Sequence, residues 1–179
     1  MIITISGESG SGKTTVGKLL AEKLNYKFFS GGYFFRKKAE ESGMNLIEFG
    51  NYAEKHPEID REQDKIILDF MKNNDDIVME SRLAGVLAYG EISAVKIYLN
   101  TSLPVRIKRL MKRDKDVNAQ QIIERSRSET LRYMQFYGLD YRVFSYYDYI
   151  IETDNYTPET IVNNIMNYLG KPFPEKNKD

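Results

Sequence analysis

Close to its start the chain carries Gly7-Glu8-Ser9-Gly10-Ser11-Gly12-Lys13-Thr14-Thr15, a stretch that fits the phosphate-binding pattern G-x-x-x-x-G-K-S/T in full. Glycines allow the backbone to curl and to direct its N–H groups inward, around the β-phosphate of a nucleotide. The helix expected to begin near Lys13 points its N-terminus at the same anion. The pattern predicts that all nine residues border ATP or GTP, with Lys13 on the β- and γ-phosphates and the Thr14 hydroxyl on Mg²⁺.

Segments that favour strands alternate with helical patterns on the C-terminal side of this loop. The expected strands cover residues 2–6, 26–30, 77–80, 95–99 and 149–153. Helices are expected at 13–24, 59–73, 103–114, 119–137 and 158–169. This alternation predicts an α/β fold with a parallel sheet that helices cover on both faces. In such sheets, ligands bind beyond the carboxyl ends of the strands.

Length and composition narrow the possible functions. With 179 residues, the chain is expected to form one domain over 1–170, followed by a polar tail at 171–179. The absence of cysteine and the single histidine exclude disulfides, thiolate metal sites and multi-histidine metal sites. No apolar run approaches the ~18 residues of a membrane span and no signal peptide is recognisable, so we expect a cytoplasmic protein without a membrane partner.

Charge is balanced over the whole chain but not along it. Lys and Arg together number 26, as do Asp and Glu, so net charge gives no reason to expect a nucleic-acid partner. Residues 40–64 nevertheless hold eight acids and two bases, whereas 104–142 hold ten bases and five acids. Two solvated helix faces would explain this imbalance. The spacing of the arginines favours a binding site instead.

The nucleotide-binding loop does not by itself separate kinases from GTPases, motors or switches. Neither the guanine motif N/T-K-x-D nor the switch motif D-x-x-G of GTPases occurs in the chain. A kinase that phosphorylates a small hydroxyl compound is expected to have a carboxylate base beside the acceptor. A kinase whose acceptor is a phosphate needs several arginines around one site instead. Arg36 and Arg82 each follow a predicted strand, and together they suggest a second phosphate pocket.

The arginines of the basic region fall on chosen faces of two expected helices. On the first helix, the positions i, i+3 and i+7 are Arg106, Arg109 and Arg113. On the second helix, one face carries Arg125, Glu129 and Arg132, and Arg127 is displaced to the side. Joined near 115–118, the two helices form a plausible closing flap. Its closure would expel water and bring positive charge to a transferring phosphoryl group.

In order and spacing, these motifs resemble those of nucleoside monophosphate kinases, and most closely those of the archaeal-type cytidylate kinases. Besides the loop, the stretches that carry the resemblance are Ser30-Gly31-Gly32-Tyr33-Phe34-Phe35-Arg36, Glu80-Ser81-Arg82-Leu83-Ala84-Gly85, the arginine-bearing helices, and Tyr147-Asp148-Tyr149-Ile150-Ile151-Glu152-Thr153 followed by Pro158-Glu159. The resemblance implies the P-loop kinase fold with a five-stranded parallel sheet flanked by helices. It also implies a monophosphate-binding arm over about 33–74 and an arginine-rich lid over about 109–137.

The resemblance also implies roles for individual residues. The acceptor nucleotide is expected to contact Ser30, Arg36, Asp60, Arg61, Arg82 and Gly85. Beyond the loop, the donor nucleotide is expected to contact Arg109, Arg113, Thr153 and Asp154. The implied catalytic residues, which neutralise the transferring group, are Lys13, Arg125, Arg127 and Arg132. Glu80 is implied to hold a magnesium-bound water beside Thr14.

The implied activity is Mg²⁺-dependent transfer of the γ-phosphate of ATP to CMP or dCMP by a monomer. Two alternatives remain open from the sequence: a kinase of another acceptor, such as AMP, UMP or a small hydroxyl metabolite, and a nucleotide-gated binding module that hydrolyses ATP slowly. Ser81 stands where such kinases usually have glycine, and Leu83 where the bacterial cytidylate kinases have an acid. Base and sugar contacts are therefore expected to differ from the bacterial pattern.

Overall fold

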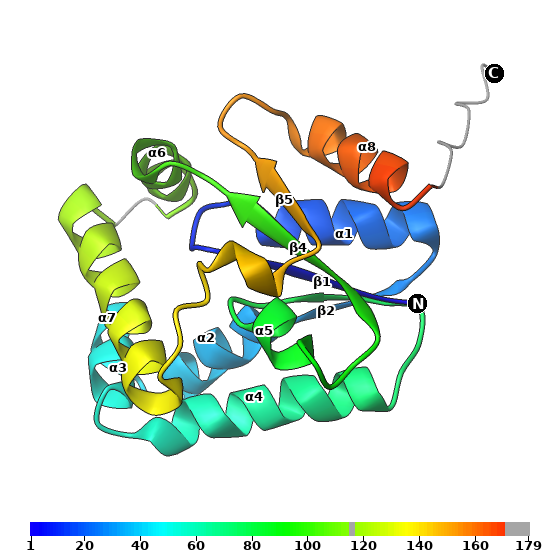
Figure 1. Ribbon diagram of the computed structural model, residues 1–179. Helices are drawn as coiled ribbons and strands as arrows, with labels where there is room; N and C mark the ends of the chain where they lie inside the picture. The colour runs from blue at the N-terminus through cyan, green and yellow to red at the C-terminus, as the bar shows by residue number, and fades with distance from the viewer. Residues whose placement is uncertain (115–116, 171–179) are drawn as a thin grey trace.

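The computed structural model describes residues 1–114 and 117–170 (Figure 1). The tail expected at 171–179 lies outside the described residues, as does part of the expected helix junction at 115–118. In chain order the elements are β1 (Ile2–Gly7), α1 (Lys13–Leu24), β2 (Lys27–Ser30), α2 (Gly31–Glu41), α3 (Leu46–Ala53), α4 (Pro57–Lys72), β3 (Ile77–Glu80), α5 (Ala84–Ala88), β4 (Ala94–Asn100), α6 (Leu103–Arg113), α7 (Ala119–Tyr137), the 3-10 turn η1 (Phe144–Tyr146), β5 (Tyr149–Glu152) and α8 (Pro158–Tyr168). Each expected strand and helix is present, with ends shifted by two residues at most.

The five strands form one parallel sheet in the order β2-β3-β1-β4-β5, which confirms the predicted architecture. The central strand β1 places Ile5 opposite Glu80 of β3 and Gly7 opposite Leu99 of β4. Every residue of β1 is buried, as expected of a strand that is covered on both faces. Because Ser30 also lies opposite Glu80, the ends of β1, β2 and β3 meet at one edge of the sheet.

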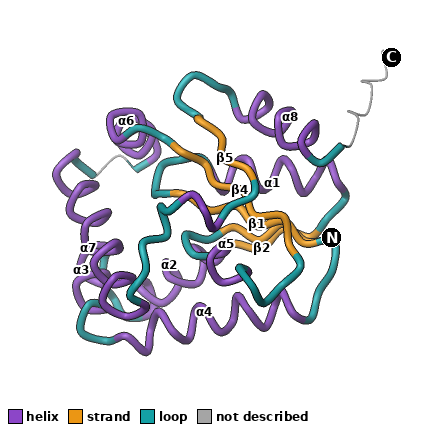
Figure 2. Tube along the Cα trace, viewed as in Figure 1, coloured by secondary structure: helices purple, strands orange, loops and turns teal. Residues whose placement is uncertain are grey.

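Helices cover both faces of this sheet (Figure 2). On one face, α1 and α8 pack against Ile3 and Ile5. On the other face, α4 and α5 pack against Ile77 and Met79. Figure 1 shows α6 and α7 beyond the carboxyl ends of the strands, where ligands bind in parallel sheets of this kind. No helix among the described residues is both long and apolar enough to cross a membrane.

The periodicity of apolar residues in the sequence does not predict α3 and α5, which are only eight and five residues long. The start of α3 nevertheless carries a capping box. The Asn45 side-chain oxygen accepts hydrogen bonds from the N–H groups of Ile47 and Glu48, both at 3.0 Å, and the Glu48 carboxylate accepts one from the Asn45 N–H at 2.9 Å. This local signal fixes where α3 begins, between α2 and α4.

Candidate active site

The loop between β1 and α1 needs glycine where its backbone leaves the right-handed region. Gly10 and Gly12 have φ angles of 85° and 96°, and Gly12 is the N-cap of α1. A Cβ on Gly10 would lie 2.9 Å from the Arg106 carbonyl oxygen, so a larger residue there would push α6 away. The N–H groups in the first turn of α1 have no partner within the helix, which makes this position suitable for an anion.

A cavity of about 1060 Å³ lies beyond the carboxyl ends of the strands, bordered by the loop, α2, α3, α6 and α7. Ligand pockets usually measure ~300–1,000 Å³, so this cavity lies at the upper end of that range. The expected site residues that line it are Ser9, Gly10, Ser11, Gly12, Lys13, Thr14, Thr15, Arg36, Glu80, Arg82, Arg109, Arg113, Arg125 and Arg132. The fold therefore brings residues from the loop, from the ends of β2 and β3, and from the two basic helices to one place.

Lys13 begins α1 and extends back over the loop, where its Nζ donates a hydrogen bond to the Glu8 carbonyl oxygen at 2.9 Å. Burial lowers the pKa of the Lys13 ammonium to about 7. The Glu80 carboxylate opposes this shift, whereas the Arg82 and Arg125 guanidinium groups add to it. Cationic groups thus crowd this end of the cavity, and a polyanionic ligand would relieve their repulsion.

Glu80 ends β3 and carries a buried carboxylate beside the loop. Its Oε1 accepts a hydrogen bond from the Thr14 hydroxyl at 3.3 Å and a close one from the Ser30 hydroxyl. Ser30 does not line the cavity itself and supports Glu80 through its hydroxyl, and the acceptor contact expected of it stays a prediction. A carboxylate and a hydroxyl next to a phosphate loop are hard oxygen ligands of the kind that Mg²⁺ accepts.

Three arginines from different elements approach one another in the cavity. Arg82 follows β3 and pairs closely with the Glu129 carboxylate of α7, while Arg125 Nε donates to the other oxygen of Glu129 at 3.2 Å. Burial, together with the charges of Arg82, Arg113 and Arg36, lowers the pKa of Arg125 to about 9. Arg36 lies on α2 with its guanidinium folded back toward Gly32.

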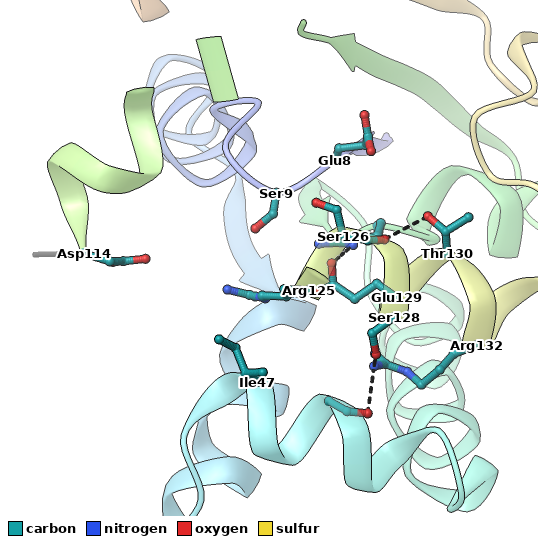
Figure 3. Close-up of polar contacts among 12 residues, drawn as sticks. Glu8, Ser9, Ile47, Asp114, Arg125, Ser126, Ser128, Glu129, Thr130 and Arg132 are labelled. Carbon is teal, nitrogen blue, oxygen red and sulfur yellow. Dashed lines mark hydrogen bonds and ion pairs between the residues drawn. The ribbon is translucent and has the colours of Figure 1, made fainter. Parts of the chain in front are cut away.

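Arg132 is held by buried polar contacts in this structure, and its expected role in neutralising the transferring group stays a prediction. Its side chain is almost fully buried, and Nε donates to the Asp60 carboxylate of α4 at 2.8 Å. Nη1 donates to the Gly50 carbonyl oxygen of α3 and to the Ser128 hydroxyl, both at 3.3 Å. Figure 3 shows Arg132 reaching from α7 toward α3. Asp60 is likewise enclosed by this pair and does not line the cavity.

A second buried carboxylate, Asp64, lies one turn further along α4 and accepts a hydrogen bond from the Tyr137 hydroxyl at 2.5 Å. Burial raises the pKa of Asp64 from 3.8 to about 7; the Tyr137 bond opposes this and the Asp60 charge adds to it. Between pH ~4 and ~7 the folded protein therefore holds a proton that the unfolded chain has lost. The free energy of unfolding accordingly falls as the pH rises through this window.

Asp64→Asn is expected to stabilise the protein at pH 8 by about 2–4 kcal/mol and to have little effect at pH 4, because asparagine carries no charge to bury and can still accept from Tyr137. Urea unfolding of both proteins at the two pH values measures the difference. Asp69→Asn, at an exposed position on α4, is the matched control. An equal change at both pH values would contradict the assigned ionisation.

The residues that follow β5 form a hydrogen-bond network around Thr153. Arg109 of α6 donates to the Thr153 carbonyl oxygen at 2.8 Å and to its hydroxyl at 3.1 Å. Asp154 accepts a hydrogen bond from the Ser102 N–H at the start of α6, at 2.9 Å. Neither Thr153 nor Asp154 lines the cavity; the two residues support Arg109 and α6, and the donor contacts expected of them stay predictions. Tyr156 lines the cavity here instead.

Three further residues expected to contact a nucleotide do not line the cavity, and those contacts stay predictions. Arg127 is exposed and absent from the cavity lining, because two residues along a helix from Arg125 correspond to about 200° of rotation. Arg61 is exposed and absent from the lining as well. Gly85 is buried: its N–H donates to the Ser6 hydroxyl at 3.0 Å, and a Cβ there would lie 2.5 Å from the Tyr147 ring. Packing against the Tyr147 ring therefore requires glycine at position 85.

The helical spacing of Arg106 and Arg109 puts both on one face of α6, but it does not predict the contacts that Arg106 makes. Its side chain is buried, and Nη2 lies 3.1 Å from the Glu8 carboxylate of the loop. Nη1 approaches the Ser9 carbonyl oxygen at 3.4 Å and the Ser126 hydroxyl of α7 at 3.3 Å. Gly7 and Glu8 do not line the cavity. Glu8 therefore anchors the loop to α6 rather than contacting a nucleotide.

Comparison with known proteins agrees with this geometry. Residues 2–155 match the model of the cytidylate kinase-like family. The chain belongs to the cytidylate kinase-like family. Cytidylate kinase from Methanosarcina mazei is 42% identical over 160 residues, covering 87% of this chain and 89% of that protein. Cytidylate kinase from Sulfurisphaera tokodaii is 40% identical over 173 residues, covering 95% and 96%.

Solved structures extend the likeness to the fold. Shikimate kinase from Acinetobacter baumannii in complex with shikimate superposes with a TM-score of 0.63 at 21% identity, covering 94% of this chain and 92% of that one. At this identity the likeness shows the P-loop kinase fold alone. Membership of the cytidylate kinase-like family therefore rests on the sequence matches.

Proposed function

We propose that this protein transfers the γ-phosphoryl group of ATP to the phosphate of CMP or dCMP, giving ADP and CDP or dCDP. The proposal rests on the agreement between the family to which the chain belongs and the geometry of the cavity. Relatives named cytidylate kinase cover nearly the whole chain at about 40% identity. The cavity also offers two sets of phosphate ligands, the loop at one end and Arg36 with Arg82 at the other.

On the donor side, the loop amides from Ser9 to Thr15 surround the phosphates of ATP, and Lys13 reaches the β- and γ-phosphates. Arg109 and Arg113 border the same nucleotide, with Tyr156 beside its base. Support for this arrangement comes from the shared cavity lining and from the buried pair of Arg106 and Glu8, which fixes the loop on α6. Such positive groups are most effective on the charge that develops in the transition state.

Mg²⁺ is proposed to bind at the Thr14 hydroxyl and, through water, at Glu80. The donor set fits this ion, because Mg²⁺ commonly takes one or two protein oxygens and completes its shell with phosphates and water. Among the described residues, no group of three or more acidic or histidine side chains forms a closed metal cage. When bound, the ion neutralises charge on the β- and γ-phosphates. Ser30 keeps Glu80 oriented toward Thr14.

On the acceptor side, Arg36 and Arg82 hold the monophosphate and Arg125 neutralises the group in transfer. Of the described residues that line the cavity, three are carboxylates, and each has a partner: Glu80 with Thr14, Asp114 with Arg113, and Glu129 with Arg82. This favours a phosphate acceptor over a hydroxyl acceptor. A phosphate oxygen is already ionised and needs no base, whereas an alcohol has a proton to lose as it attacks.

The arm at about 33–74 and the lid at about 109–137 are proposed to close over the two nucleotides. The pairs of Arg132 with Asp60 and of Tyr137 with Asp64 tie the second half of α7 to α4. Arg106 and Arg109 likewise fix α6 to the loop and to Thr153, so closure of the lid is assigned to the first half of α7. The described residues of one chain supply both ends of the cavity, which supports a monomeric catalyst.

A panel of acceptors tests the proposed function. ADP release is followed with ATP, Mg²⁺ and one acceptor at a time: CMP, dCMP, UMP, AMP, and the hydroxyl compound shikimate. We expect CMP or dCMP to raise the rate at least 100-fold over ATP alone, and shikimate to leave it unchanged. Equal turnover without any acceptor would indicate an ATP-hydrolysing module, and a rate increase with shikimate alone would indicate a hydroxyl kinase.

A further inference from the structure

Glu129 bridges two arginines at the centre of the acceptor side. It lies on α7 with 5% of its surface exposed. One carboxylate oxygen contacts Arg82, which comes from the turn after β3, and the other accepts from Arg125 Nε at 3.2 Å, one helical turn earlier. Figure 3 shows Arg125 and Glu129 close together on α7. Both arginines and Glu129 line the cavity.

Several cationic side chains surround the Glu129 carboxylate. When no ligand is bound, these cations need a counter-ion from the protein itself. Lys13, Arg36 and Arg113 line the same cavity as Arg82 and Arg125. The depressed pKa of Arg125, caused by burial and by the neighbouring arginines, shows how crowded these cations are. Two guanidinium groups taken out of water without a counter-ion carry a large desolvation penalty. Glu129 supplies that counter-ion.

A phosphate would compete with Glu129 for the same donors. Arg82 presents its guanidinium to the cavity from the strand end, so a ligand phosphate that binds it arrives where the Glu129 carboxylate already lies. A phosphate dianion brings more charge and three acceptor oxygens, compared with two oxygens and one charge for a carboxylate. It can accept from Arg36, Arg82 and Arg125 together. A small monoanion has no such advantage over Glu129.

We propose that Glu129 is a built-in substitute for the acceptor phosphate: it holds Arg82 and Arg125 in the empty enzyme and is displaced when a phosphate dianion binds. The inference rests on the proposed role of Arg82 in holding the acceptor phosphate. Glu129 acts through the two arginines and is a positioning residue. Displacing the carboxylate costs the same free energy for each anion that takes its place, so the exchange lowers the affinity for these anions by one common factor.

Glu129→Gln tests the exchange, because glutamine keeps the shape and one acceptor oxygen but removes the competing charge. Binding of CMP and of inorganic phosphate is measured by calorimetry with the loop saturated by a non-hydrolysable ATP analogue. We expect both dissociation constants to fall by at least about tenfold, because removing a like charge ~4 Å away contributes close to that factor even when water screens it fully, and more at an effective dielectric constant of ~20. The dissociation constant of the ATP analogue is expected to change less than twofold.

Glu124→Gln is the matched control, since Glu124 is exposed on α7, lies outside the cavity lining and carries the same charge. It is expected to leave both acceptor-side constants within twofold of the parent protein. Weaker or unchanged binding in Glu129→Gln would overturn the proposal, because a residue that only supports the arginines cannot improve binding when it is altered.

Two further measurements keep the test decisive. If Glu129→Gln does not fold, a crystal structure of the parent protein with CMP decides: Arg82 and Glu129 are expected to be separated by more than ~4 Å, and an intact pair would overturn the proposal. The phosphate measurement does not depend on the base. Tighter phosphate binding without CMP binding would therefore support the exchange while contradicting the proposed substrate.

Discussion

Lys13→Ala is expected to lower kcat for phosphoryl transfer by about a thousandfold while leaving the fold intact. Lys13 Nζ lies over the loop, 2.9 Å from the Glu8 carbonyl oxygen, and is the ammonium nearest to where the γ-phosphate would lie. Removing a single preorganised donor from a transition-state charge commonly costs a factor of ~100–1,000, and here a full positive charge is removed as well. Steady-state rates with saturating ATP and CMP measure the loss.

The matched control for this variant is Lys18→Ala, which removes an exposed lysine from the same helix α1. It is expected to retain at least half of the parent activity. Circular dichroism and thermal unfolding of Lys13→Ala are expected to resemble those of the parent, because the shortened side chain relieves a buried cation whose pKa is already depressed. Activity within tenfold of the parent would contradict the role of Lys13.

Arg82→Ala is expected to raise the KM for CMP about 100-fold and to leave the KM for ATP within about twofold. Charge-assisted hydrogen bonds from a guanidinium contribute ~1.5–3 kcal/mol, and Arg82 is proposed to hold the acceptor phosphate. The split between the two KM values is the informative result. A structural defect would raise both values together.

Arg142→Ala controls for the loss of one arginine, because Arg142 is exposed and pairs with Asp140 away from the cavity. It is expected to change neither KM by more than about twofold. An equal rise of both KM values in Arg82→Ala would place Arg82 in the framework shared by both substrates. A rise confined to ATP would move it to the donor side.

The sequence is sufficient to place the sheet and the phosphate loop because both depend on local patterns. Strand 77–80 and helices 13–24 and 119–137 are predicted to the residue, since apolar periodicity and capping signals lie within each segment. The loop motif likewise specifies its own conformation through Gly10 and Gly12. These features need no knowledge of distant contacts.

The partners of the arginine side chains depend on contacts between distant segments of the chain, so they could not be predicted from local sequence patterns. Helical spacing correctly puts Arg125, Glu129 and Arg132 on one face and Arg127 on another. It does not reveal that Arg132 meets Asp60, 72 residues away in the chain. Periodicity specifies the direction of a side chain, whereas its partner is decided by the elements packed opposite.

The first basic helix illustrates the same limit. Arg106, Arg109 and Arg113 share a helix face, yet the first anchors Glu8, the second contacts Thr153 and the third pairs with Asp114. Positions along the axis of α6 decide these partners, because each turn of the helix faces a different loop. A buried Arg106 is detectable only once the loop and α6 are known to be in contact.

The most direct test of the account is to identify the products by ³¹P nuclear magnetic resonance after incubating the protein with ATP, CMP and Mg²⁺. Transfer between two phosphates predicts that signals of ADP and CDP grow in equal amounts as those of ATP and CMP decline, with no inorganic phosphate. Formation of ADP and inorganic phosphate with CMP unchanged would contradict it.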